Sequence, residues 1–167
     1  MRVVIDCNVL IAANRRETTA SLACSAACAR RLLDAADNDV LLEDTTNLIW
    51  GEYKRYCSFS GQPGPGDRFF VWLVRNRWTP ERVHRIDIGA DDDEIEAHVP
   101  SALRDFHRSD RKWIVTYIGG VGEALYNALD SDWSESTKDL SDAGINVVEL
   151  CPQDLRHLLS VRFDGKL

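Results

Sequence analysis

MRVVIDCNVLIAAN, residues 1–14, is the stretch that decides the fold. Within it, residues 3–5 form a short run of β-branched apolar side chains, which is typical of a strand buried on both faces of a parallel sheet. Asp6 ends that run, and the apolar residues 9–11 can begin a helix that packs on the sheet. Because ligands of open α/β sheets bind at the carboxyl ends of strands, Asp6 is placed to face a ligand. The alternative is that Asp6 only caps the next helix, since cap and ligand positions coincide at a strand–helix junction.

Short apolar runs alternate with helical patterns along the rest of the chain. Strands are predicted at residues 40–42, 83–89, 123–130 and 145–150, and helices at residues 21–37, 47–56, 69–78, 110–118 and 151–161. This alternation predicts an α/β fold, a three-layer α/β/α sandwich around a central and mainly parallel sheet. The length favours a single domain that spans residues 1–167.

Three more acids stand far apart in the sequence, each beside an apolar segment. Glu52 lies in NLIWGEYKRY, Asp110 in FHRSDRKWIVTYIGG and Asp130 in LYNALDSDW. For Glu52 and Asp110, a purely structural role is an alternative. Glu52 could form an ion pair with Lys54 or Arg55, although residues two or three apart on a helix pair less well than those four apart. Asp110 could sit at a helix N-terminus because the helix dipole favours an acid there.

Taken in order, these segments resemble the PIN-domain ribonucleases, a family that includes toxin nucleases. MRVVIDCNVLIAAN resembles the family's opening strand with its Asp-Thr-Asn ending, and IWGEY resembles the helix that carries its glutamate. SDRKWIVTYI and ALDSDW resemble the third and fourth acidic segments, so the likeness covers roughly residues 1–151. Cys7 departs from the pattern, since the family has Thr or Ser at this position.

The resemblance implies a metal-dependent endoribonuclease that cleaves single-stranded RNA. Carboxylate oxygens suit hard cations, so the expected cofactor is Mg²⁺ or Mn²⁺, which lowers the pKa of a bound water. We expect the catalytic and metal-holding residues to be Asp6, Glu52, Asp110 and Asp130, with support from Asn8 and Asp132. Asp130 and Asp132 would share one face of an extended segment, and Asp130 stands nearer the predicted strand.

Two other classes of function stay open. The same acids would suit a DNA nuclease of the flap type, and a PIN-like module with weak catalysis would act by binding or regulation. The resemblance also allows two protein partners, a small antitoxin and a second copy of the chain. No apolar run approaches the ~20 residues that a membrane span requires, so no membrane is expected.

Composition points to an ordinary α/β protein of the cytoplasm. The formal net charge is −7, which is unusual for a nucleic-acid enzyme, but local clusters such as Arg108, Arg111 and Lys112 can still bind phosphate. No signal peptide is expected, because Asp6 interrupts the first apolar run. The five cysteines are odd in number and scattered, which argues against a disulfide framework and for a reducing compartment. Cys24 and Cys28 are expected to be small buried thiols on an Ala-rich helix.

Three shorter segments carry local predictions. Thr45 or Thr46 could cap the helix that contains Glu52. The Gly/Pro-rich residues 58–69, SFSGQPGPGDRF, are predicted to form a loop. The acidic run at residues 91–96 lacks the central Gly of a calcium loop and is expected to be a solvated surface segment.

Overall fold

The computed structural model describes residues 1–60 and 62–164. Its strands are β1 (Arg2–Ile5), β2 (Val40–Asp44), β3 (Val83–Ile86), β4 (Ala124–Asn127) and β5 (Val147–Glu149). Its helices are α1 (Cys7–Asn14), α2 (Leu22–Asn38), α3 (Leu48–Tyr56), α4 (Pro65–Asn76), α5 (Asp92–His98), α6 (Arg111–Gly119), α7 (Ser131–Glu135), α8 (Thr137–Asp142) and α9 (Pro152–Asp164). Two short 3-10 turns precede α6, η1 (Ser101–Leu103) and η2 (Arg108–Asp110). Residue 61 of the predicted loop and residues 165–167 of the predicted domain lie outside the described residues.

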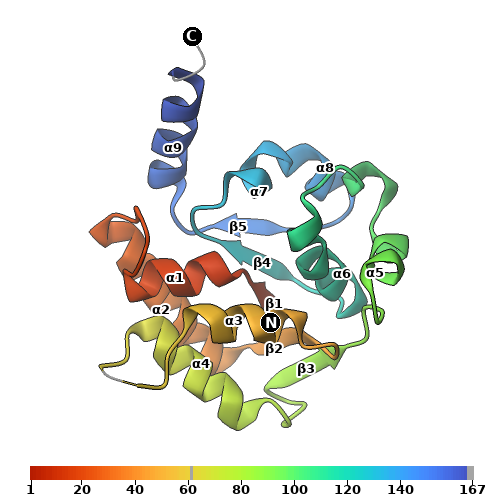
Figure 1. Ribbon diagram of the computed structural model, residues 1–167, viewed down its shortest axis with the longest axis horizontal. Coiled ribbons are helices and arrows are strands. Elements are labelled where there is room, and N and C mark those ends of the chain that lie inside the picture. The colour runs from red at the N-terminus through yellow and green to blue at the C-terminus, as the bar shows by residue number, and fades with distance from the viewer. Residues whose placement is uncertain (61, 165–167) are drawn as a thin grey trace.

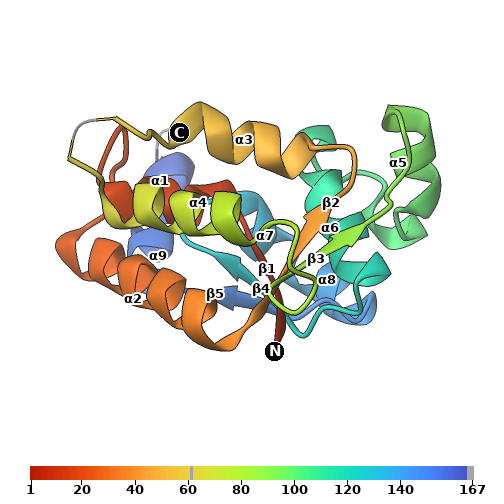
Figure 2. The same ribbon diagram turned by 90° about the horizontal axis from the view of Figure 1, so that it is seen from below.

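The described strands form one parallel sheet in the order β3-β2-β1-β4-β5. Helices cover both faces of this sheet (Figure 1, Figure 2), so the predicted three-layer α/β/α sandwich is confirmed. The chain moves outward from β1 to β3 and then returns to add β4 on the other side of β1. The strand order therefore reverses between β1 and β4, and open α/β sheets bind their ligands beside such a point.

The centre of the core is formed by the two strands at this reversal. Val3, Val4 and Ile5 of β1 are fully buried, and every residue of β4 is buried as well. In register, Val3 lies between Leu41 of β2 and Ala124 of β4. The β-branched run at the start of the chain is thus covered on both faces, as its composition predicts.

The predicted loop at residues 58–69 is too long, because α4 begins inside it at Pro65. Proline is compatible with the first turn of a helix, where its missing N–H would have no partner within the helix. The Asp67 carboxylate completes this turn by accepting the backbone N–H of Gly64 at 2.9 Å. The acidic run, by contrast, is solvated as predicted, since most side chains of α5 are exposed.

The prediction that Thr45 or Thr46 caps α3 is wrong. The side chain of Asp44, at the end of β2, accepts the backbone N–H groups of Leu48 and Ile49, each at 2.8 Å. A carboxylate offers two acceptor oxygens and so satisfies two free N–H groups of the helix at once. The Thr46 hydroxyl donates to the same carboxylate at 2.6 Å and holds it in place.

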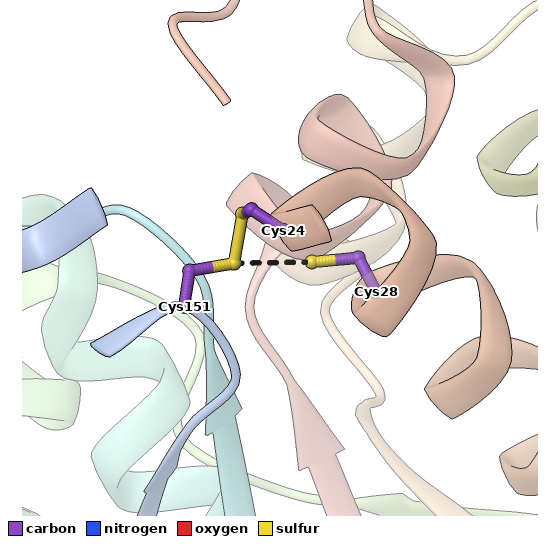
Figure 3. A group of neighbouring side chains, drawn as sticks. All are labelled: Cys24, Cys28 and Cys151. Carbon is purple, nitrogen blue, oxygen red and sulfur yellow. Dashed lines mark hydrogen bonds between the residues drawn. A yellow bond between two sulfur atoms is a disulfide. The ribbon is translucent and has the colours of Figure 1, made fainter. Parts of the chain in front are cut away.

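The cysteines also differ from the prediction, because Cys24 of α2 forms a disulfide with Cys151, which directly precedes α9. Figure 3 shows Cys28, one turn further along α2, with its sulfur pointing toward Cys151. The expectation of a chain without disulfides is therefore wrong for this pair, whereas Cys28 is a buried free thiol as predicted. Spacing could not reveal the bond, since its two cysteines are separated by 127 positions.

Within residues 1–60 and 62–164, no helix combines the length and the apolar character needed to cross a membrane.

Candidate metal centre

Asp6 follows β1 and is held by two hydrogen bonds. One carboxylate oxygen accepts the backbone N–H of Asn8 at 2.9 Å, and the other accepts the indole N–H of Trp133 at 2.9 Å. Asp6 is only 4% exposed, and Trp133 is fully buried. Asp6 therefore caps α1, as one reading of the sequence held. Capping alone explains neither the burial of Asp6 nor its second hydrogen bond, which the Trp133 indole of α7 donates.

Asp130 and Asp110 approach Asp6 from two other elements. Asp130 follows β4 and accepts the backbone N–H of Asp132, at the start of α7, at 2.9 Å. Asp110 ends η2 directly before α6, but its side chain makes no capping hydrogen bond to that helix. The Asp110 side chain is 14% exposed. A favourable helix dipole thus accounts for an acid at this position, but the carboxylate accepts the Ser109 hydroxyl at 3.2 Å and makes no hydrogen bond to the helix.

The three carboxylates meet at the carboxyl edge of the sheet, where the strand order reverses. One oxygen from each of Asp6, Asp110 and Asp130 lies within 4.8 Å of the corresponding oxygens of the other two. We call these residues the carboxylate trio. Three like charges this close in a partly buried position repel one another strongly, because the surroundings screen them less than water does.

Burial, together with this crowding, raises the pKa values of two members of the trio. Burial, together with the negative charge of Asp130, raises the pKa of Asp6 to about 7. Burial and Asp130 likewise raise the pKa of Asp110 to about 6, against a smaller opposing effect of Lys112. Two carboxyl groups therefore titrate close to neutral pH at one place in the fold, and such perturbed groups cluster at functional sites.

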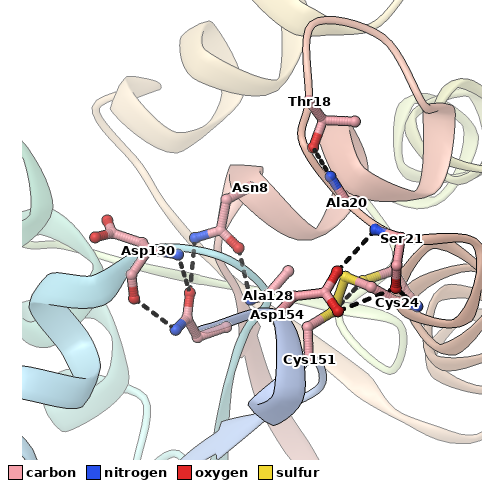
Figure 4. Close-up of a disulfide and its surroundings, with 11 residues drawn as sticks. Asn8, Thr18, Ala20, Ser21, Cys24, Ala128, Asp130, Cys151 and Asp154 are labelled. Atoms are coloured by element: carbon pink, nitrogen blue, oxygen red, sulfur yellow. Dashed lines mark hydrogen bonds between the residues drawn. A yellow bond between two sulfur atoms is a disulfide. The ribbon is translucent and has the colours of Figure 1, made fainter. Parts of the chain in front are cut away.

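Asn8 belongs to the framework behind the trio. Its amide nitrogen donates to the side-chain oxygen of Asn127 at 2.9 Å, and its amide oxygen accepts the backbone N–H of Ala128 at 2.7 Å. Asn127, at the end of β4, donates in turn to the backbone carbonyl of Asp130 at 2.8 Å. Figure 4 shows Asn8 directed toward the segment that carries Asp130. These bonds join the ends of β1 and β4 and set the separation of the two acids that follow them.

Glu52, the fourth predicted acid, lies outside the trio. Its carboxylate forms an ion pair with Lys112 of α6 at 2.7 Å, rather than with Lys54 or Arg55, the partners of the alternative interpretation. The Lys112 side chain is 10% exposed and also donates to the backbone carbonyl of Ser109. Lys112 therefore neutralises Glu52 beside the trio and lies close enough to Asp110 to affect its titration.

Asp132 is not a member of the trio. The extended segment predicted for residues 130–132 is wrong, because α7 begins at Ser131. Residues two apart in a helix do not share a face, so Asp132 cannot follow Asp130 toward the same point as it would in a strand. Its observed link to Asp130 is made by its backbone N–H.

Two residues that shape this site, Asn127 and Trp133, were not predicted from the sequence, and Lys112 was named only as part of a phosphate-binding cluster. Asn127 and Trp133 flank Asp130 in the chain and fix the end of β4 and Asp6 respectively, and Lys112 follows Asp110 by two positions. A lysine before the apolar part of α6 and a tryptophan directly after Asp132 were the available signals. The partners of these two residues could not be predicted from the sequence, since Lys112 pairs with Glu52 of α3 and Trp133 donates to Asp6 after β1.

Two hollows flank the trio. One has a volume of about 380 Å³ and is lined by Asn8, Asp130, the segment at residues 17–19 and Leu158 of α9, among others. The other has a volume of about 230 Å³ and is lined by Glu52, Lys112, Arg108, Arg111 and parts of α3 and α5. The first hollow reaches Asp130 of the trio, whereas the second is lined by Ser109, the residue before Asp110, and gathers the cationic residues.

The residues present fit a hard divalent cation. All three donors of the trio are carboxylate oxygens, which suit Mg²⁺ or Mn²⁺ better than softer metals. Burial and the neighbouring carboxylates raise the pKa values of Asp6 and Asp110, and a bound cation would favour their charged forms. Asp6, Asp110 and Asp130 are therefore the residues that would hold such an ion.

Comparison of the chain with protein-family models, with curated proteins and with solved structures finds no match. The resemblance to PIN-domain ribonucleases consequently stays a prediction, and the functional argument depends on the geometry of the trio.

Proposed function

We propose that this protein is a metal-dependent endoribonuclease that cleaves single-stranded RNA. The observation that carries the proposal is the carboxylate trio at the β1–β4 reversal, with its oxygens within 4.8 Å of one another. The resemblance of the four acidic segments to PIN-domain ribonucleases supports the choice of reaction.

The chain's own groups preorganise the trio. The Asn8 N–H and the Trp133 indole N–H each hold one oxygen of Asp6, and the Asn8–Asn127 bond fixes the approach of Asp130. A divalent ion bound there would supply a water of lowered pKa and would stabilise the negative charge that develops on the phosphate. Because burial limits the access of bulk water to Asp6, these electrostatic interactions are stronger than they would be at an exposed surface.

The flanking hollows offer a path for an extended polynucleotide. Lys112, whose charge affects Asp110 of the trio, lines the hollow of about 230 Å³, and Arg108 lines it as well. A phosphate backbone needs local positive charge rather than a basic protein overall, so the net charge of −7 is compatible with RNA binding here.

The Glu52–Lys112 pair suggests how many ions the site takes. A second divalent ion would need Glu52 as an additional ligand, but Lys112 already neutralises that carboxylate at 2.7 Å. We therefore favour one ion held by the trio, with the Lys112 ammonium as a fixed positive charge beside it.

The test uses the purified full chain with single-stranded RNA, single-stranded DNA and a DNA flap. We expect internal cleavage of RNA with Mg²⁺ or Mn²⁺, no cleavage with a chelator, and a loss of at least ~10²-fold in rate for Asp6→Asn. Asp142→Asn, a change at an exposed residue that pairs with Lys138, is the matched control and should retain full activity. Preferred cleavage of the DNA flap would replace the RNA proposal with the DNA alternative, and wild-type activity of Asp6→Asn would refute the site.

A narrower form of the proposal is a toxin whose activity is blocked by a small antitoxin protein. It predicts that a small reading frame adjacent to the gene encodes a protein that binds this chain and stops RNA cleavage. Co-expression followed by purification through one partner would test this directly, and an adjacent frame without inhibitory effect would exclude it.

A further inference from the structure

A second cluster of chemically active side chains lies away from the trio, where α2 meets the start of α9. Its members are Cys24, Cys28 and Cys151, whose sulfur atoms lie within 4.8 Å of one another. Cys24 and Cys151 are joined, and the Cys28 sulfur lies 3.8 Å from that of Cys151 (Figure 3). All three are buried, with exposed fractions of 3% or less.

The same junction is held by a second set of contacts. Asp154, in the first turn of α9, accepts the backbone N–H of Ser21 at 2.7 Å and its hydroxyl at 3.0 Å. The Ser21 hydroxyl in turn accepts the backbone N–H of Cys24 at 3.1 Å and caps α2. Figure 4 shows this arrangement around the disulfide. These polar contacts join the same two elements as the disulfide, but the Ser21–Asp154 bonds are exposed to solvent and hold the junction less firmly than a covalent bond.

Among its described side chains, α9 has few other contacts with the rest of the fold. α9 is the last element of the described chain and projects from the rest of the fold (Figure 1). Within residues 152–161 of α9, Leu155 is the buried side chain, and Leu158 reaches the hollow that is also lined by Asn8 and Asp130. Terminal helices with few buried contacts open most readily, so a covalent link at the first turn has a large effect on this helix.

We propose that Cys24 and Cys151 form a reversible redox site that fastens α9 to α2 when oxidised and releases it when reduced. A small disulfide such as oxidised glutathione is the oxidant. One protein thiolate attacks it to give a mixed disulfide and one glutathione thiol, and the second protein thiolate then displaces the other glutathione. In total, two protein thiols lose two electrons and two protons, and one glutathione disulfide becomes two thiols.

Cys28 does not replace Cys24 in this reaction. Burial, with a smaller effect of Asp154, raises the pKa of the Cys28 thiol to about 12. At neutral pH the Cys28 thiol therefore stays protonated beside the closed bond. The structure joins Cys151 to Cys24 and leaves the Cys28 sulfur 3.8 Å away, which makes Cys24 the partner. The proposal is also independent of nuclease activity, because each of its readouts concerns thiols or the motion of α9.

The first experiment equilibrates the full chain, without oxygen, in mixtures of reduced and oxidised glutathione. The samples are quenched with acid, alkylated under denaturing conditions and analysed by peptide mass spectrometry. We expect one two-electron transition in which Cys24 and Cys151 lose alkylation together, while Cys7, Cys28 and Cys57 stay alkylated. Cys24→Ala and Cys151→Ala should each abolish the transition, and Cys28→Ala, a change in the same buried cluster, should preserve it.

The second experiment follows hydrogen exchange in the oxidised and reduced wild-type protein. We expect the amides of residues 155–161 in α9 to exchange at least tenfold faster after reduction, with no change in β1. A pair that stays joined in excess reduced glutathione, or stays open in the most oxidising mixture, would overturn the proposal. One equivalent of zinc retained by the reduced cysteines, or equal exchange of α9 in both states, would also overturn it.

Discussion

Asp67 and Asp6 are both buried, but the chain treats their charges in opposite ways. Asp67 is fully buried, accepts the backbone N–H groups of Ser58 and Gly64 at 2.9 Å each, and pairs with Arg16 at 2.7 Å. Burial alone would raise the pKa of Asp67, but these donors and the guanidinium outweigh it and hold the pKa below its usual value. Asp6 has two neutral donors and two acidic neighbours, and its pKa rises to about 7.

The difference separates a structural acid from a candidate ligand. The charge of Asp67 is balanced by groups of the protein itself, so this carboxylate stabilises the loop before α4 without help from solution. The trio retains negative charge that its own surroundings do not balance, and a cation from outside would lower its free energy. Burial by itself does not distinguish the two cases, whereas the supply of donors and cations does.

The largest effect on stability is expected at Asp67, whose charge is balanced by groups of the protein. Asp67→Ala should lower the free energy of unfolding by about 3 kcal/mol, because several buried donors lose their acceptor. Denaturant unfolding would measure the loss, and Asp142→Ala should leave stability nearly unchanged. Asp67→Ala should not change the stabilisation of the protein by Mg²⁺. Loss of that stabilisation would show that Asp67 and the trio are not independent.

Magnesium should stabilise the wild-type protein through the trio. At a hundredfold excess over the dissociation constant, the gain from binding the folded state is about 2.7 kcal/mol. For a chain of this length, this corresponds to a rise in melting temperature of roughly 5–10 °C. Thermal melts with a magnesium titration would show a smaller shift for Asp6→Asn and an unchanged one for Asp142→Asn. Equal shifts in all three proteins would mean that Asp6 does not bind the ion.

The trio should also make the metal-free protein less stable as the pH rises toward 7. The folded pKa values of Asp6 and Asp110 lie above the unfolded value of 3.8, so the folded state binds more protons between these limits. Raising the pH therefore removes stability across this window, on the order of 2 kcal/mol between about pH 5.5 and 7.5. Asp67 is ionised in both states in this range and does not affect the slope.

Denaturant unfolding at several pH values, with a chelator present, would measure this slope. Asp6→Asn should flatten it, and saturating Mg²⁺ should reduce it because the ion competes with protons for the same oxygens. A slope that is identical in wild type and Asp6→Asn would contradict the raised pKa of Asp6.

The smallest effect is expected at Asp132. Its contact with Asp130 uses the backbone N–H, which Asp132→Asn retains, so the rate of RNA cleavage should fall by less than about fivefold, or about 1 kcal/mol. Asp130→Asn removes a trio oxygen and should abolish cleavage in the same assay. A larger loss from Asp132→Asn than from Asp130→Asn would reverse the assignment of the two residues.

Much of the fold could be predicted because it depends on short-range patterns. The β-branched run before Asp6 and the alternation of apolar runs with helical segments specify a parallel sheet covered by helices. Since parallel strands end at a common edge, acids that follow β1 and β4 had to come close together. The positions of Asp6 and Asp130 follow from this rule, and Asp110 joins them because α6 begins at the same edge.

The pairings within the site could not be predicted in the same way. Lys112 neutralises Glu52, Trp133 donates to Asp6, and Cys24 is joined to Cys151, each across a long stretch of chain. The caps were also misjudged, because Asp44 reaches two N–H groups that a nearby threonine was expected to satisfy.

The sequence by itself therefore determined the α/β class and the edge of the sheet at which most of the predicted acids gather. Only the tertiary structure decided which carboxylates form the trio, which one is neutralised by a lysine, and which cysteine reaches α9. The physical reason is that periodicity and strand direction act over a few residues. The balance of charge around a buried group, in contrast, depends on side chains that folding brings together from distant parts of the chain.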